Sequence, residues 1–323
     1  MELQEAHKRS DEYRTGDQAN ASIGEARITP TQGEAGSGVN IVSPQAGASA
    51  PCPACNTAQG TGAAAAALPQ FIYAMGRVEA RFPTASVEKE FAQAIGRAAT
   101  EGLTDNQTLR EVLSKRENRY LLRQLCWVFR IEGIETYILV PRDPTDFDLL
   151  LESLRATPNP TDIDIAIGFK GPIAPATVCN GLMVPIVVFD QIYSFDRDLL
   201  IKSIPKPEKT TEKAFRAAAE QVLDLILQLA DNAGATDEHR ALNYLVVRYP
   251  AIYTTAADAF ARDASLTGVE VRPSPLSGTR KIVEVIFSFT NRNTDVIEKF
   301  FTRVDVTEEF PFLVTKISPY YDR

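Results

Sequence analysis

Two alternating stretches around Gly133 constrain the fold of this chain more than any other feature. Apolar side chains occupy every second position from Leu125 to Ile131, including the only tryptophan, Trp127, and the pattern repeats from Ile134 to Val140. Successive side chains of a strand point to opposite faces, so this period of two predicts an antiparallel hairpin with one well-buried face. The residues before it, 118–122, fit a strand or a helical turn equally well.

The same reasoning places further elements along the chain. Helical spacing after an N-cap at Ser86 predicts a first helix that ends at Gly102, and Thr104 starts a second. Gly76–Pro83 is expected to be a turn. Pro185 lacks a donor, so its strand should be an edge or carry a bulge. The remaining predicted elements are strands at 70–75, 162–169, 182–189, 283–289, 299–306 and 312–317, and helices at 146–156, 196–204, 211–231, 237–248 and 251–264.

These elements predict an α+β fold in two lobes that follow a disordered arm. Residues 1–67 contain one aromatic side chain, Tyr13, and too little apolar surface to offset the entropy of ordering. Residues 68–205 form a mixed α/β first lobe built on the central hairpin. Pro205–Lys209 is interpreted as a linker, and residues 206–323 as a second lobe of three helices on an antiparallel sheet.

The composition limits the classes of partner. Asp and Glu number 42 against 34 Lys and Arg, which gives a net charge of −8 and a pI near 5.1. Phosphate binding requires a basic surface, so no nucleic-acid partner is expected. No apolar run approaches the roughly 20 residues that span a bilayer, and the charged first residues lack the apolar core of a signal peptide. We therefore expect a cytoplasmic protein without a membrane partner.

The four cysteines predict no disulfide framework, which agrees with a reducing compartment. Cys52 and Cys55 form a CxxC motif, which can be a redox pair or half of a zinc site. The motif lies in the arm, away from any strand–helix junction, so linker thiols are the first interpretation. A structural zinc site, within one chain or shared between two, is the alternative.

The remaining candidates for chemistry are scattered. Cys126 lies beside the tryptophan and is interpreted as a small buried hydrophobe. Cys179 lies in a loop and would need a base to act as a nucleophile; His239 is interpreted as a solvated residue in the first turn of a helix. Carboxylates cluster in three segments, where helix capping is favoured over acid–base or metal chemistry. These segments are Asp143–Asp148, Asp162–Asp164 and Asp190–Asp198.

Gly168 and Gly171 follow a predicted strand and suggest a phosphate loop, but their spacing fits neither a Walker A motif nor a dinucleotide fingerprint. On residues alone, a binding module is favoured over an enzyme.

Four long blocks resemble the C-terminal region of PatG-type cyanobactin maturation proteases. One of them is ENRYLLRQLCWVFRIEGIETYILVPRDPTDFDLL, residues 117–150, and the CxxC segment resembles the linker that precedes that region. The resemblance begins near Phe71 and covers about three-quarters of the chain. The other three blocks are residues 72–97, 179–204 and 305–323.

The resemblance implies a role in making modified cyclic peptides from ribosomal precursors. The family's macrocyclising protease is subtilisin-like and uses Ser, His and Asp. This sequence has no histidine between His7 and His239 and none of the protease motifs, so protease activity is not expected of it. The resemblance carries over no catalytic residues.

Two hypotheses follow. In the first, the chain is a non-catalytic accessory domain that binds the precursor peptide or partner enzymes, or dimerises as a homo-oligomer. In the second, it is a peptide-tailoring enzyme of the same pathway that uses Cys179, His239 or an Asp cluster.

Overall fold

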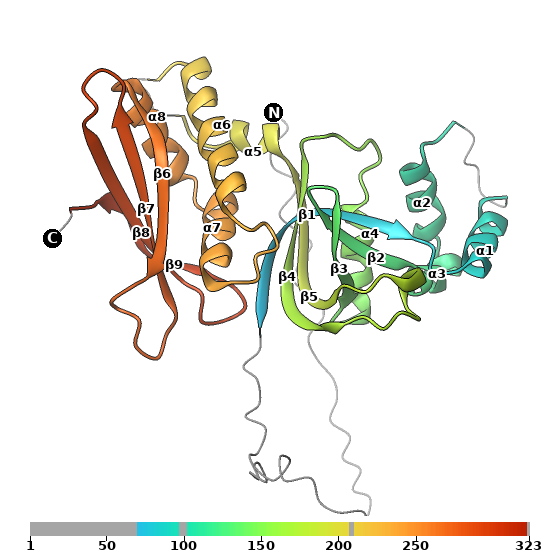
Figure 1. Cartoon of the computed structure of the whole chain (residues 1–323). Coiled ribbons are helices and arrows are strands. Elements are labelled where there is room, and N and C mark those ends of the chain that lie inside the picture. The colour runs from blue at the N-terminus through green and yellow to red at the C-terminus, as the bar shows by residue number, and fades with distance from the viewer. Residues whose placement is uncertain (1–69, 97–101, 207–209, 322–323) are drawn as a thin grey trace, which may run out of the picture. The chain divides into compact units, whose positions relative to one another are not determined.

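The computed structural model describes residues 70–96, 102–206 and 210–321. The predicted arm, with Cys52 and Cys55, lies outside these residues. The α+β fold class is confirmed: eight α-helices and two sheets occupy the described part of the chain (Figure 1). No helix in that part is long and apolar enough to cross a membrane.

The first sheet is a closed five-stranded barrel with the strand order β1-β2-β3-β5-β4. The predicted hairpin forms β2 and β3, joined by a two-residue turn in which Glu132 and Gly133 both have positive φ. Such a turn matches the twist of the flanking strands. Only the β3–β5 pair is parallel. The strands are β1 (Phe71–Arg81), β2 (Cys126–Ile131), β3 (Ile134–Pro141), β4 (Asp162–Ile173) and β5 (Pro185–Asp196).

Short helices pack on the barrel and complete its core. Trp127 is 2% exposed, and its indole N–H donates to the carbonyl of Leu122 at 3.0 Å. This bond ties α3 to β2, and residues 119–124 are helical, not extended. The helices on the barrel are α1 (Ala85–Ile95), α2 (Asp105–Ser114), η1 (Arg116–Asn118), α3 (Arg119–Gln124), η2 (Pro144–Asp146) and α4 (Phe147–Ser153). The short η3 (Cys179–Gly181) lies between β4 and β5, and α5 (Arg197–Ser203) contributes Ile201 to the core of the second sheet.

The second sheet is antiparallel with the strand order β6-β7-β8-β9, and three helices cover one of its faces (Figure 1). Val283, Val285, Phe287 and Phe289 alternate along β7 and point into a core shared with these helices. The strands are β6 (Ala264–Pro273), β7 (Ile282–Asn291), β8 (Ile297–Asp305) and β9 (Phe312–Pro319), and the helices are α6 (Glu212–Leu229), α7 (Asp237–Arg248) and α8 (Ala251–Ala261).

Strand β1 connects the barrel to the helices of the second sheet. Ile72 and Ala74 belong to the barrel core, whereas Tyr73 and Met75 pack with α6, α7 and α8. The first half of β1 pairs with β4 on one side only. Its other side donates hydrogen bonds to the α6–α7 loop, from Tyr73 N–H to the carbonyl of Gly234 at 3.1 Å and from Met75 N–H to that of Asn232 at 2.8 Å.

Several local predictions are wrong. Gly76–Arg81 continues β1 instead of turning, because Gly76 pairs with β4 and Arg77–Arg81 pair with β2. The N-cap of α1 is Thr84, not Ser86. For the strand with Pro185, the edge alternative is wrong, because β3 and β4 flank β5. The bulge alternative agrees with the β4–β5 ladder, whose register shifts between Ile167 and Gly168 and between Lys170 and Ile173. Strand β6 was not predicted at all.

Candidate ligand-binding pocket

A cavity of about 480 Å³ lies beside the β2–β3 turn. Its walls come from five segments: the middle of β1, the end of β2 with its turn, the start of β4, the first residue of α5, and the end of α6 with the following loop. This volume is in the range of pockets that bury small ligands. Its charged lining residues are Arg77, Glu79, Arg130, Glu132, Asp162 and Arg197.

Backbone geometry fixes the wall between β1 and β2. A Cβ on Gly76 would lie 2.3 Å from the carbonyl oxygen of Arg130, so only glycine permits this approach. The β2–β3 register shifts between Phe129 and Arg130, at the same level. Arg77 and Arg130 face each other in the β1–β2 ladder, which places both guanidinium groups on rigid strands.

Most of the arginines here are ion-paired. Glu79 accepts from Arg130 at 2.5 Å and from Arg81 at 3.0 Å, and Arg81 also reaches Glu135 at 2.8 Å. The second guanidinium nitrogen of Arg130 donates to the carbonyl of Gly133 at 2.6 Å. These side chains are each about a third exposed, so the pairs contribute little stability and mainly set side-chain positions.

Arg77 and Glu132 are exceptions. Arg77 donates to two backbone carbonyls. Its Nε lies 3.3 Å from the carbonyl oxygen of Asp162, and a terminal nitrogen donates to the carbonyl of Pro160. It has no carboxylate partner among the described residues. Glu132 accepts from the Asn232 amide at 3.3 Å and has no Lys or Arg partner in the same part of the chain. The pocket thus offers one cation and one anion that the protein does not neutralise, next to the apolar side chains of Met75 and Leu227.

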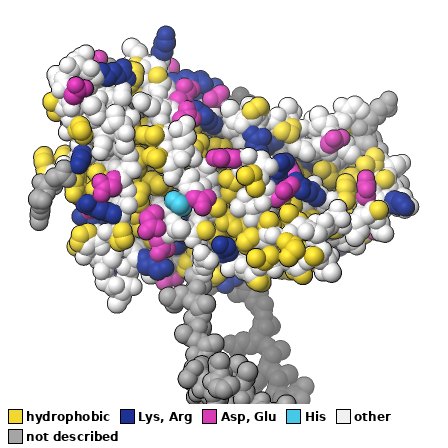
Figure 2. All heavy atoms as spheres, in the orientation of Figure 1, with side chains coloured by type: hydrophobic (Ala, Val, Ile, Leu, Met, Phe, Trp, Pro, Cys, Tyr) yellow, Lys and Arg dark blue, Asp and Glu magenta, His cyan; other side chains and the backbone are white. Residues whose placement is uncertain are grey.

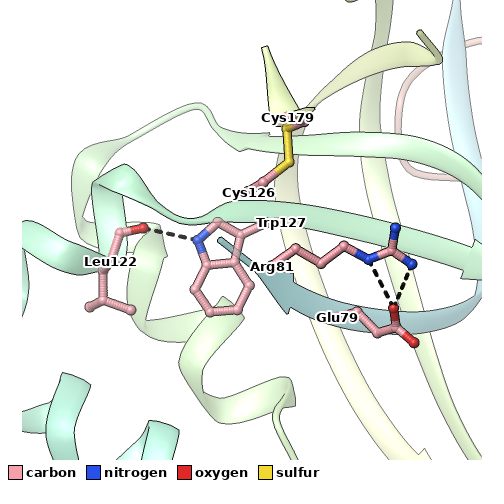
Figure 3. The surroundings of a disulfide bond; sticks show 6 residues. All are labelled: Glu79, Arg81, Leu122, Cys126, Trp127 and Cys179. Atoms are coloured by element: carbon pink, nitrogen blue, oxygen red, sulfur yellow. Dashed lines mark hydrogen bonds and ion pairs between the residues drawn. A yellow bond between two sulfur atoms is a disulfide. The ribbon is translucent and has the colours of Figure 1, made fainter. Parts of the chain in front are cut away.

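The structure corrects the expectation about cysteines. Cys126 and Cys179 form a disulfide, with their Cα atoms 5.5 Å apart (Figure 3). Cys126 is buried, as predicted, but as half of a cross-link and not as a free thiol. The bond ties the loop between β4 and β5 onto the outer face of β2, where Val128 and Ile138 complete a small separate core. A disulfide sulfur is not a thiolate nucleophile.

The proposed base does not join a site with Cys179. His239 lies in the first turn of α7, as predicted, and its backbone N–H donates to the hydroxyl of Thr236 at 3.3 Å. Its Nδ1 is buried and has no hydrogen-bond partner among the described residues. Neither His239 nor Cys179 lines the pocket.

The carboxylate clusters mostly cap helices, as expected. Asp143 accepts from Thr145 N–H at 2.8 Å and from the Thr145 hydroxyl, and these bonds hold its pKa below the usual value. Asp196 accepts from the Thr161 hydroxyl at 2.6 Å and from Leu199 N–H at 3.0 Å, with the same effect on its pKa. Among the described residues, no group of three or more His, Cys, Asp and Glu could hold a metal ion.

Asp164 behaves differently from its neighbours. It is 5% exposed and accepts from Val78 N–H at 2.7 Å and from the Ser194 hydroxyl. Burial raises the pKa of the Asp164 carboxyl to about 6, although both hydrogen bonds lower it. The sequence placed this residue in an acidic cluster but gave no sign of its burial, because its partners come from β1 and β5.

A second buried carboxyl was not predicted at all. Glu309, in the β8–β9 connection, lies beside Asp190 of β5. Arg142 is 2.9 Å from Asp190 and 3.9 Å from Glu309. Burial and the neighbouring Asp190 carboxyl raise the pKa of Glu309 to about 7, against the lowering effect of Arg142 and Arg240. The two acids are 119 positions apart in the sequence, so no local pattern could reveal the pair.

The glycines suggested as a phosphate loop lie within β4. A Cβ on Gly168 would lie 2.2 Å from the carbonyl oxygen of Val188, so this glycine allows close pairing with β5. It therefore serves the barrel and not a phosphate.

Figure 2 shows acidic and basic side chains interspersed on the visible face of the molecule.

The fold and the cavity define an α+β protein that joins a closed barrel to a helix-covered sheet and carries a pocket of mixed charge. Residues 209–320 match the model of the PatG C-terminal family. The solved structure of a PatG domain of unknown function has the same fold, with a TM-score of 0.64 and 21% sequence identity. That match covers 78% of this chain and 98% of the other. The resemblance noted in the sequence is confirmed. No curated protein matches the chain.

Proposed function

We propose that this chain is a non-catalytic accessory domain of a cyanobactin-like pathway and that it binds the linear precursor peptide in the cytoplasm. The match to the PatG C-terminal family supports the pathway. The observation that carries the proposal of binding is the pocket of about 480 Å³ with an Arg77 side chain that no carboxylate of the described residues neutralises. A guanidinium fixed on a strand is a preorganised group for recognition.

Two further observations favour holding over transforming a ligand. The only thiol considered as a nucleophile, Cys179, is cross-linked to Cys126, and His239 does not line the pocket. Six charged side chains line the pocket. Four of them are ion-paired (Glu79, Arg130, Asp162 and Arg197), and Arg77 and Glu132 are not. Such an arrangement suits recognition by charge and shape.

Isothermal titration calorimetry with the pathway's unmodified precursor peptide tests this function. We expect saturable binding that weakens with added salt, because charged groups contribute to it. Absence of binding to the precursor up to millimolar concentration would refute the proposal.

Two parallel measurements separate the other roles. A change in the mass of the peptide after incubation with the chain would indicate a tailoring enzyme. A mass of the chain that grows with its concentration, without any heat from the peptide, would indicate a dimerisation unit.

A further inference from the structure

We propose that the pocket beside the β2–β3 turn recognises a carboxylate of the bound peptide, and that Arg77 is the residue that reads it. This inference rests on the proposed function and names the chemistry that the same pocket selects. The carboxylate could belong to the C-terminus of the peptide or to an Asp or Glu side chain, and the experiment below distinguishes the two.

The bonding of Arg77 supports this role. Its Nε and one terminal nitrogen donate to the carbonyls of Asp162 and Pro160 at the start of β4, which holds the guanidinium in place. A guanidinium carries five N–H donors, so donors remain for a ligand. Carbonyl partners do not neutralise its charge, whereas carboxylates neutralise Arg130 and Arg197, at 2.5 Å and 2.8 Å.

The rest of the pocket argues for a carboxylate over other anions. Glu79, Glu132 and Asp162 line the same cavity, and their charges would repel a phosphate group or a nucleic-acid backbone. A single carboxylate carries one charge, and its two oxygens match the planar fork of arginine. Glu132, without a basic partner among the described residues, can accept an N–H from the peptide beside that carboxylate.

The apolar part of the wall favours a peptide over a free small acid. Met75, Ile131, Ile163 and Leu227 come from four different elements and line the cavity together with the charged groups. An apolar surface next to a fixed cation fits an aliphatic side chain and a neighbouring carboxylate of one peptide.

The chain provides a matched control for Arg77. Arg81 lies four residues further along the same strand and carries the same charge, but it is paired with Glu79 and Glu135 and does not line the pocket. R77Q and R81Q change the net charge equally. Any difference between them in peptide binding therefore reports on the pocket and not on the overall field of the protein.

The test measures binding of three N-acetylated short peptides of the same apolar sequence to the full chain. The first has an Asp side chain and an amidated C-terminus, the second a free C-terminal carboxylate and no acidic side chain, and the third neither group. We expect R77Q to weaken binding of one or both acidic peptides about tenfold or more, R81Q to change it less than about twofold, and R77K to give an intermediate affinity because lysine keeps the charge but not the fork. Which acidic peptide responds identifies the source of the carboxylate.

Three outcomes would overturn the inference: equal effects of R77Q and R81Q, equal affinity of the neutral and acidic peptides, or no binding of either acidic peptide to the unsubstituted chain at millimolar concentration. If R77Q does not fold, as judged by circular dichroism, the comparison of R77K with an R81K variant replaces it.

The precursor peptide separates this inference from the proposed function. Equal binding of the precursor to the unsubstituted chain and R77Q would refute the role of Arg77 and leave the function intact. Arg77-dependent binding of short acidic peptides without any binding of the precursor would refute the proposed function and leave the role of Arg77 intact.

Discussion

Replacing Gly234 with alanine should destabilise the chain far more than the same change at Gly133, although both residues have positive φ, of 58° and 85°. A Cβ on Gly234 would lie 1.9 Å from the carbonyl oxygen of Tyr73, whereas nothing lies within 4 Å of one on Gly133. The comparison isolates the steric contact between the α6–α7 loop and β1, because the two substitutions share the backbone penalty of alanine at positive φ.

The structure sets the size of the effect. Alanine in the left-handed region costs about 1–2 kcal/mol at either site. Relief of the clash at Gly234 requires the loop to move away from β1, which breaks the 3.1 Å bond from Tyr73 N–H and strains the neighbouring 2.8 Å bond from Met75 N–H. It also disturbs the 2.7 Å bond from the buried Asn243 amide to the Tyr73 carbonyl. At about 1 kcal/mol for each bond, G234A should lose about 4–5 kcal/mol in total.

Urea unfolding measures both variants. The fluorescence of Trp127 follows the barrel, and far-ultraviolet circular dichroism follows both sheets and the helices. If the free energies of unfolding of G234A and G133A agree within about 0.5 kcal/mol, the close approach of Gly234 to Tyr73 is not a feature of the folded protein.

Two further predictions concern the cross-link and the buried acid. Cys179→Ser should lower the free energy of unfolding by about 2–4 kcal/mol, because the disulfide to Cys126 closes a loop of 53 positions in the unfolded chain. Reduction of the unsubstituted protein should have the same effect. Non-reducing peptide mapping that finds no linked pair would contradict the prediction. Folding raises the pKa of Glu309 from 4.5 to about 7, so between these pH values the folded chain binds more protons than the unfolded chain. The free energy of unfolding should therefore fall as the pH rises through this range, by at most about 3 kcal/mol. Glu309→Gln should flatten this fall, most clearly between pH 6 and 7.5, since the Asp164 pKa of about 6 gives a similar fall at lower pH. Identical slopes of the urea midpoint against pH in the unsubstituted chain and the variant would contradict the raised pKa of Glu309.

The sequence determined the class of fold and most of its elements. Periods of two and of about 3.6 residues are local consequences of one buried face, so β2, β3, β7 and the helices α2 and α5–α8 could be located without the structure. Where a strand has no such face, the pattern failed. Strand β6 contains Thr267, Glu270 and Arg272 and was not found, and the polar second half of β1 was predicted to be a turn. The long resemblance blocks identified the family that residues 209–320 match.

Only the tertiary structure decided what the side chains do together. Barrel closure depends on pairing β1 with both β2 and β4, which are separated from it by tens of residues, and no local signal encodes such pairing. The Cys126–Cys179 bond, the Asp190–Glu309 pair and the charges of the pocket arise in the same way. In the sequence, Arg77 is one of many arginines. It stands apart only because the fold gives its neighbours carboxylate partners and leaves Arg77 with backbone carbonyls in a cavity.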